Sequence, residues 1–175
     1  LQGALAVCLV GSALPASALP GFDEVRRAFQ PSDTLILSHE GAIDKYIGDS
    51  VMAFWGAPEI QDDHAARACR AALAIRAALA ADPGSPAIRI GIQSGPTLVG
   101  NIGAPGRLNY TLVGDTVNVA QRLEQLGKSV SPAERTTILI AAATFDHLRG
   151  SQVRTEKVGE MQMTGTDKLI LVHRL

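Results

Sequence analysis

Two short segments of the chain combine charged side chains with glycine at spacings that could support chemistry. In the first, residues 44–50 read Asp-Lys-Tyr-Ile-Gly-Asp-Ser, which places the cation of Lys45 and the carboxylate of Asp49 at the tip of a predicted hairpin. Gly-Asp pairs are also common in turns for purely conformational reasons. By itself, this segment therefore favours an ordinary solvated turn over a functional one.

The second segment covers residues 110–122 and includes the amide of Asn118 and the guanidinium group of Arg122. If a helix begins at Asp115 or Thr116, Asn118 and Arg122 are four residues apart and share one face of it. The same pair could form an ordinary polar helix face. Because residues 117, 119 and 120 around it are apolar, we expect the Asn118 amide to need a hydrogen-bond partner.

Composition restricts the classes of function that these segments can serve. The 175 residues suffice for one domain with a core, and 46% hydrophobic content with a net charge of −1 is typical of a globular protein. Basic residues are scattered rather than clustered, so the sequence offers no nucleic-acid-binding surface. Cys8 and Cys69 are far apart in apolar stretches, and no disulfide or zinc site is expected. No metal-ligand spacing relates the four histidines: His39, His64, His147 and His173.

The elements that must position these residues alternate between strands and helices. We predict strands at residues 5–10, 42–47, 51–55, 87–99, 110–113 and 136–140, with a final pair near the end. We predict helices at 23–40, 62–81, 116–126 and 142–148, with Gly41 ending the first and Asp62 or Asp63 capping the second. This pattern favours an α+β fold, a mostly antiparallel sheet with helices packed on it, in a single domain over residues 1–175.

The first 22 residues carry no charged side chain, and residues 14–18 resemble a signal-peptidase site. The stretch lacks an initiator methionine and a basic region, and its prolines and glycines disfavour a membrane span. We therefore expect a cytoplasmic domain belonging to a longer protein, or one on the cytoplasmic face of a membrane if that protein is anchored.

Three motifs, in order, resemble the catalytic domain of class III adenylyl and guanylyl cyclases of the bacterial type. They are Lys-x-x-Gly-Asp at 45–49 followed by Met-Ala-Phe-Trp-Gly-Ala-Pro at 52–58, then Arg-Ile-Gly-Ile at 89–92 with Val-Gly-Asn-Ile-Gly at 99–103, and Tyr-Thr-x-x-Gly-Asp-x-Val-Asn-x-Ala-x-Arg at 110–122. The resemblance runs from about residue 41 to 128 and continues weakly to the end. It implies a ferredoxin-like antiparallel sheet with helices, and a head-to-tail homodimer.

The resemblance implies an adenylate cyclase that converts ATP to 3′,5′-cyclic AMP and pyrophosphate. Lys45 and Thr111 would bind the base, since adenine offers an acceptor at N1 and a donor at N6, whereas guanine presents the opposite pattern. Asn118 would orient the ribose, and Arg122 would neutralise charge on the α-phosphate. Asp49 would bind Mg²⁺ or Mn²⁺. Asp49 of one copy would face the other four residues of its partner, so a monomer would be inactive. A sensor or membrane region in the full-length protein would regulate the domain.

The sequence departs from the family pattern in its opening strand. The family places a first metal-binding aspartate there, in a pattern such as Asp-Leu-Val-Gly-Ser, but residues 7–12 read Val-Cys-Leu-Val-Gly-Ser. An alternative is therefore a degenerate, non-catalytic cyclase homology domain that acts as a nucleotide-binding or dimerising regulatory module. A guanylyl cyclase, opposed by Lys45, and a generic ferredoxin-like binding domain are further alternatives.

Overall fold

The computed structural model of the chain describes residues 2–12, 22–104, 106–163 and 169–175. The signal-peptidase-like residues 14–18 lie outside these ranges. Strands and helices alternate in the described part. In chain order they are β1 (Gln2–Ser12), α1 (Phe22–Ser38), β2 (Ala42–Ile47), β3 (Ser50–Trp55), α2 (His64–Ala81), β4 (Ile88–Ala104), β5 (Arg107–Val113), α3 (Asp115–Val130), β6 (Thr136–Ala141), α4 (Ala142–Asp146), β7 (Glu156–Gln162) and β8 (Leu169–Arg174).

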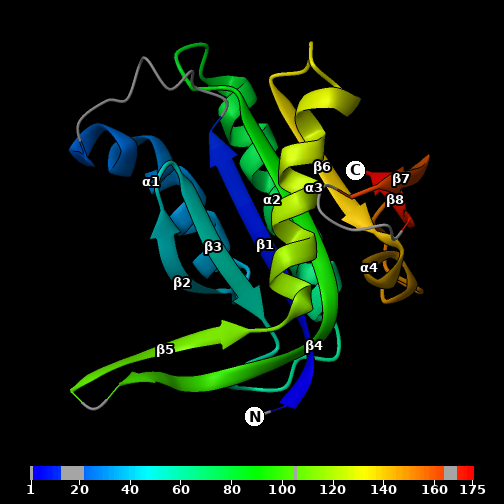
Figure 1. Cartoon of the computed structure of the whole chain (residues 1–175). Helices are drawn as coiled ribbons and strands as arrows, with labels where there is room; N and C mark the ends of the chain where they lie inside the picture. Colours follow the sequence, from blue (N-terminus) through cyan, green and yellow to red (C-terminus); the bar gives the residue numbers. More distant parts are fainter. Residues whose placement is uncertain (1, 13–21, 105, 164–168) are drawn as a thin grey trace.

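The described strands form one eight-stranded sheet in the order β2-β3-β1-β4-β6-β8-β7, with β5 paired to β4 outside this path. Within it, β4 and β6 pair in parallel, and the other strand pairs are antiparallel. The predicted mostly antiparallel sheet is therefore confirmed. In Figure 1 the ends of β4 and β5 form a long arm that reaches away from the centre of the sheet toward the side of β2.

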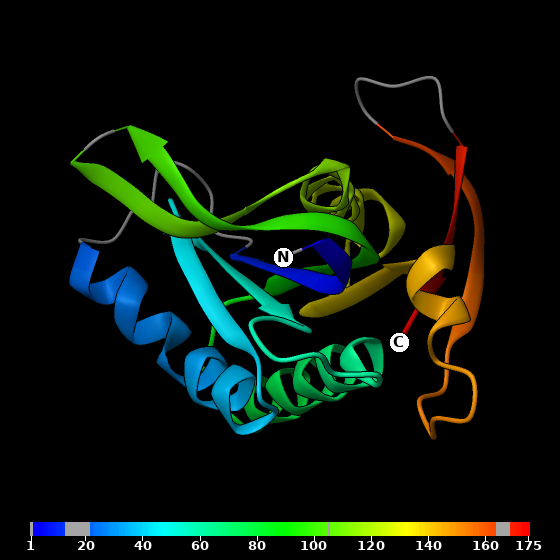
Figure 2. The ribbon, with the colours of Figure 1, turned by 90° about the horizontal axis from the view of Figure 1, so that it is seen from below.

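Helices cover both faces of this sheet. Figure 2 shows α1 and α2 side by side on one face and α3 on the other. Against the α1 and α2 face packs a cluster that includes Ile36, Trp55, Ile75 and Ile90. Two smaller clusters, one centred on Val7 and Ala120 and one on Leu123 and Leu139, join α3 to the opposite face. Because each helix buries an apolar stripe against the sheet, the two faces together account for the core.

Both cysteines belong to the α1 and α2 side of the core, where they are buried and free. Burial raises the pKa of both thiols, that of Cys69 to about 12, so both act as small apolar side chains. Among the described residues, no helix is long and apolar enough to cross a membrane.

Two predicted helix boundaries have a different physical basis from the one expected. The first helix ends at Ser38, and the residue with left-handed backbone is Glu40, whose φ is 59°, rather than Gly41. Gly41 is needed for space instead, since a Cβ there would lie 2.5 Å from the Trp55 ring. Asp63 precedes the second helix, but its carboxylate makes no capping hydrogen bond. It binds side chains of the helix itself.

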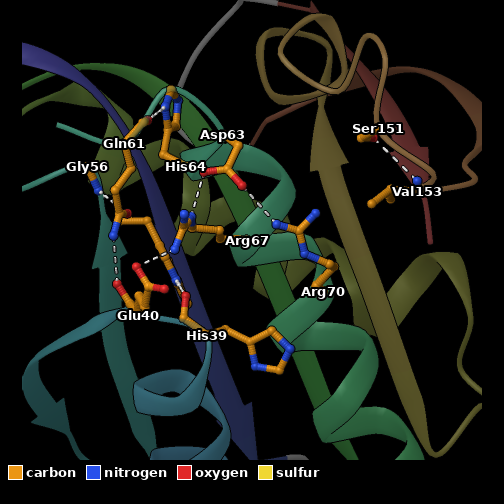
Figure 3. Close-up of polar contacts among 11 residues, drawn as sticks. His39, Glu40, Gly56, Gln61, Asp63, His64, Arg67, Arg70, Ser151 and Val153 are labelled. Carbon is orange, nitrogen blue, oxygen red and sulfur yellow. Dashed lines mark hydrogen bonds and ion pairs between the residues drawn. The ribbon is translucent and has the colours of Figure 1, made fainter.

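Those side chains belong to a polar network around the start of α2 (Figure 3). The Asp63 carboxylate accepts hydrogen bonds from Arg67 at 2.5 Å and from Arg70 at 3.0 Å. Arg67 also pairs with Glu40, and the Gln61 amide donates to the Glu40 carbonyl at 3.1 Å. This network ties the loop before α2 to the end of α1. Because the Asp63 carboxylate pairs with these arginines, it does not cap the helix. The hydrogen bond from Arg67 lowers the pKa of Asp63.

His64 lies next to this network and is a buried titratable group. Its side chain is buried, Nδ1 lies 3.0 Å from the Gln61 carbonyl oxygen, and the ring lies 4.9 Å from that of His147. Burial lowers the pKa of His64 below 6.5, with a smaller contribution from His147, against the opposing effects of the Gln61 carbonyl, Asp63 and Asp62. The unfolded chain therefore takes up a proton here at a higher pH than the folded chain.

The free energy of unfolding should accordingly be fully maintained above about pH 6.5 and should decrease as the pH falls through the lowered pKa of His64. The variant H64Q, which cannot titrate, should lose less stability than the wild type when urea unfolding at about pH 7.5 and pH 5 is compared. Some loss should persist in H64Q because burial also lowers the pKa of His173. Parallel pH profiles for the two proteins would contradict this assignment.

Candidate functional site

The structure brings Lys45 and Thr111 together through a third side chain, Asp44. The Thr111 hydroxyl donates a hydrogen bond to Asp44 Oδ2 at 3.0 Å, and Lys45 Nζ lies 3.4 Å from the same oxygen. Lys45 keeps 44% of its side chain exposed, whereas that of Asp44 is 1% exposed. The partly exposed ammonium group of Lys45 and the buried hydroxyl group of Thr111 therefore lie close together, although β3, α2 and β4 separate their strands in the chain.

A β-bulge in the hairpin of β2 and β3 places Asp44 and Lys45 next to each other. Ile43 pairs with Ala53 and Lys45 with Met52, so Asp44 is an extra residue with no partner of its own on β3. Adjacent residues of a regular strand point to opposite faces, but a bulge can place two of them on the same side. The bulge therefore allows both side chains to approach Thr111 of β5.

Asn118 and Arg122 lie on α3, which follows β5 after Gly114, and the predicted placement on one helix is confirmed. Asn118 is exposed and Arg122 is half-buried. In the described part of the chain, neither side chain makes a hydrogen bond or an ion pair. The apolar neighbours Val119 and Ala120 are buried in the core while Asn118 is exposed, so those neighbours do not bury its amide. Both polar groups are available to a ligand.

Asp49 lies in the turn between β2 and β3 and is partly exposed. Its side chain makes no hydrogen bond or ion pair to any described residue, so the structure does not bring it into contact with Lys45, Thr111, Asn118 or Arg122 of the same copy. The charged group it influences is Glu124 on α3. Burial raises the pKa of Glu124, and the Asp49 carboxylate adds to this effect.

Glu124 is itself held by Arg89 of β4, whose Nε donates to Glu124 Oε1 at 2.9 Å. The Glu124 side chain is 10% exposed and that of Arg89 is 19% exposed. Arg89 opposes the rise in the pKa of Glu124 but does not cancel the effect of burial. This pair fixes α3 against the sheet. The carboxylate oxygen that binds Arg89 is therefore already engaged.

The carboxylates available for a divalent cation within one copy are few. In the described ranges, no group of three or more His, Cys, Asp or Glu side chains is placed to bind a metal ion together. Residues 2–12 of β1 contain no acidic residue, so this strand, whose Gly11 pairs with Ser50, adds no carboxylate to that of Asp49. Magnesium prefers near-octahedral coordination by several oxygen atoms. The described donors of one copy therefore do not by themselves fit a two-metal site.

Sequence reasoning identified Lys45, Thr111, Asn118 and Arg122 but overlooked Asp44. Its position directly before Lys45 is visible in the sequence, but its burial depends on a bulge and on contact with Thr111, 67 residues further along the chain. An aspartate inside a predicted strand was the available signal, because acidic residues are depleted in strands unless they serve a purpose there.

The fold is shared with solved cyclase structures. The adenylyl cyclase CyaB from P. aeruginosa superposes with a TM-score of 0.82 at 27% identity, over 99% of this chain and 94% of that chain. The guanylate cyclase domain of RhGC from Catenaria anguillulae, solved in complex with GTP, gives a TM-score of 0.83 at 26% identity, over 98% and 94% of the two chains. The fold is therefore that of a class III nucleotidyl cyclase domain, as the motifs implied.

The family model for the adenylate and guanylate cyclase catalytic domain matches residues 17–173, and the chain belongs to this family. Adenylate cyclase 1 of Rhizobium meliloti (strain 1021) is 38% identical over 131 residues, which are 70% of this chain. The matched region spans 20% of that relative's length. Both adenylate and guanylate cyclases are similar to this chain, so the choice of base depends on its own residues.

Proposed function

We propose that this domain is an adenylate cyclase that converts ATP to 3′,5′-cyclic AMP and pyrophosphate. The observation that carries the choice of ATP is the convergence of Lys45 and Thr111 on Asp44. The ammonium group can donate to N1 of adenine, and the hydroxyl oxygen can accept from its 6-amino group. Guanine carries a hydrogen at N1 and an oxygen at C6, so it would leave both protein groups without partners, which a site built on hydrogen bonds strongly disfavours.

The exposed face of α3 supports the remaining roles. Asn118 would hold the ribose, and Arg122 would contact the α-phosphate. In the reaction, the 3′-oxygen forms a bond to the α-phosphorus while the bond from that phosphorus to the pyrophosphate oxygen breaks. Positioning and charge stabilisation govern such a step. The guanidinium group of Arg122 can donate two parallel hydrogen bonds to phosphate oxygens, and it is paired with no carboxylate of the described residues.

A second copy of the chain would complete the site. Apolar side chains are exposed on the β4 and β5 arm close to Thr111: Leu98, Leu108, Tyr110 and Val113. Grouped exposed apolar residues of this kind mark interaction surfaces. We propose that a head-to-tail partner covers them and brings its Asp49, as the metal-binding carboxylate, to the Lys45, Thr111, Asn118 and Arg122 of this copy.

The test is cyclic nucleotide formation by the purified domain from ATP and from GTP, with Mn²⁺ or Mg²⁺, over a range of protein concentrations. Cyclic AMP should rise faster than linearly with protein concentration, because the active species is a dimer, and GTP should react more slowly than ATP. A faster rate with GTP would contradict the assignment of the base.

The composition of β1 favours a second candidate, a degenerate cyclase domain that binds nucleotide or a partner without turnover. This strand contributes no carboxylate next to Asp49. Calorimetry with an ATP analogue separates the two functions. Binding without any cyclic AMP at high protein concentration with Mn²⁺ would support the degenerate domain, and measurable turnover would exclude it.

A further inference from the structure

We propose that Asp44 fixes the direction of hydrogen bonding at the pair formed by Lys45 and Thr111, and so makes this site select adenine. The inference deepens the proposed function and rests on it. Asp44 would not touch the nucleotide. It is a positioning residue that acts through the two side chains it holds.

Among the described residues, the polar contacts of the Asp44 side chain are with Lys45 and Thr111. Its side chain is 1% exposed, and Oδ2 is shared by the Thr111 hydroxyl at 3.0 Å and Lys45 Nζ at 3.4 Å. The other oxygen, Oδ1, is buried and has no hydrogen-bond partner among the residues that the structure describes. Within the described residues, the carboxylate therefore has no polar contact that would explain its position other than those with Lys45 and Thr111.

The hydroxyl of Thr111 has one proton, and it donates that proton in a hydrogen bond to the Asp44 carboxylate. A threonine hydroxyl can donate once and accept twice. Because its proton points to Oδ2, the Thr111 oxygen can only accept from a base. The 6-amino group of adenine is a donor and fits this arrangement, whereas the 6-oxygen of guanine would need the proton that is already engaged. Without Asp44 the hydroxyl could rotate, and it could then accept from the 6-amino group of adenine or donate to the 6-oxygen of guanine.

Stability does not account for a carboxylate at this position. A buried ion pair must offset the cost of desolvating both groups, and apolar replacements of similar volume are often neutral or stabilising. The unpartnered Oδ1 adds to that cost. Buried polar groups whose hydrogen bonds are incomplete are expected at functional sites. The position of Asp44 next to the proposed base-binding pair fits that expectation.

The test compares the binding of 3′-deoxy-ATP and 3′-deoxy-GTP by calorimetry, since neither analogue has the attacking hydroxyl and binding is measured apart from turnover. The wild type should prefer the adenine analogue. D44L, which is similar in size but cannot accept a hydrogen bond, should reduce the ratio of the two affinities by about tenfold or more. D44N retains one acceptor oxygen and should keep most of the preference. D44A, too small to overpack the site, gives a second measurement of the same loss if D44L does not fold.

Asp33 offers a matched control on α1. It accepts a hydrogen bond from the Tyr46 hydroxyl at 2.6 Å, and its Oδ1 is likewise buried without a partner in the described part of the chain. D33L removes the same kind of contact away from the base-binding pair, so the affinity ratio should not change.

The possible results separate this inference from the proposed function. A loss of preference in D44L and D44A, but not in D33L, supports the role of Asp44. An unchanged preference in folded D44L or D44A overturns it and leaves the adenylate cyclase assignment standing. A wild type that binds neither analogue, or that prefers the guanine analogue, contradicts the proposed function, and the role of Asp44 falls with it.

Discussion

Replacing Arg122 by alanine is expected to reduce kcat for cyclic AMP formation by about a hundredfold or more. The side chain lies half-buried on α3, four residues after Asn118, and makes no ion pair or hydrogen bond within the described ranges. Its loss should therefore remove charge stabilisation that the α-phosphate requires as pyrophosphate leaves, while the fold keeps its contacts. Steady-state kinetics with ATP at saturating metal would measure kcat and KM separately, and kcat should carry most of the loss.

Two further variants sharpen this experiment. R122K keeps the charge but loses the planar group that can bind two phosphate oxygens together, so it should fall between the wild type and R122A. K128A removes a second exposed cation from α3, on a different face of the helix, and should leave kcat within about threefold of the wild type. If R122A retained wild-type kcat, the role assigned to Arg122 would have to be abandoned.

Local patterns were sufficient to predict the elements that carry the site. Residues 42–47 and 51–55 form the predicted hairpin, and Asn118 and Arg122 share the predicted helix. Strand and helix periodicity depend on neighbours within a few residues, and a single chain contains that information. Strand β4 is longer than predicted because its last residues, 100–104, pair with β5 in the arm rather than with the central sheet.

Contacts between distant elements could not be predicted in the same way. The burial of Asp44 depends on a bulge and on Thr111, and the approach of Asp49 to Glu124 depends on how α3 crosses the sheet. The apolar neighbours of Asn118 in the sequence suggested that its amide would be buried. Helical geometry instead turns those neighbours inward and the amide outward. The sequence offered Lys45, Thr111, Asn118 and Arg122 as candidates, whereas the involvement of Asp44 required the structure.

Gly91 determines how closely α3 can approach the sheet, and through it the positions of Asn118 and Arg122. A Cβ at Gly91 would lie 2.2 Å from the Ala120 carbonyl oxygen, 2.4 Å from the Glu124 nitrogen and 2.9 Å from the Leu123 Cβ. Two of these atoms are backbone, so a change of side-chain rotamer cannot relieve the overlap. Gly91 also pairs with Leu9 of β1 and Leu139 of β6, so β4 is fixed on both sides and the helix has to move.

The free energy of unfolding of the variant G91A should therefore be lower than that of the wild type by about 3 kcal/mol or more, at the upper end of the range for overpacked cores. For a domain of this size, that corresponds to a melting temperature lower by about 6–12 °C. G100A is the matched control on the same strand, since no atom lies within 4 Å of a Cβ there. It should melt close to the wild-type temperature, because alanine restricts the unfolded chain more than glycine does. Equal melting temperatures for G91A and G100A would show that α3 can shift without cost. If instead folded G91A binds 3′-deoxy-ATP more weakly than G100A, then the close packing at Gly91 is what places Asn118 and Arg122 for the nucleotide.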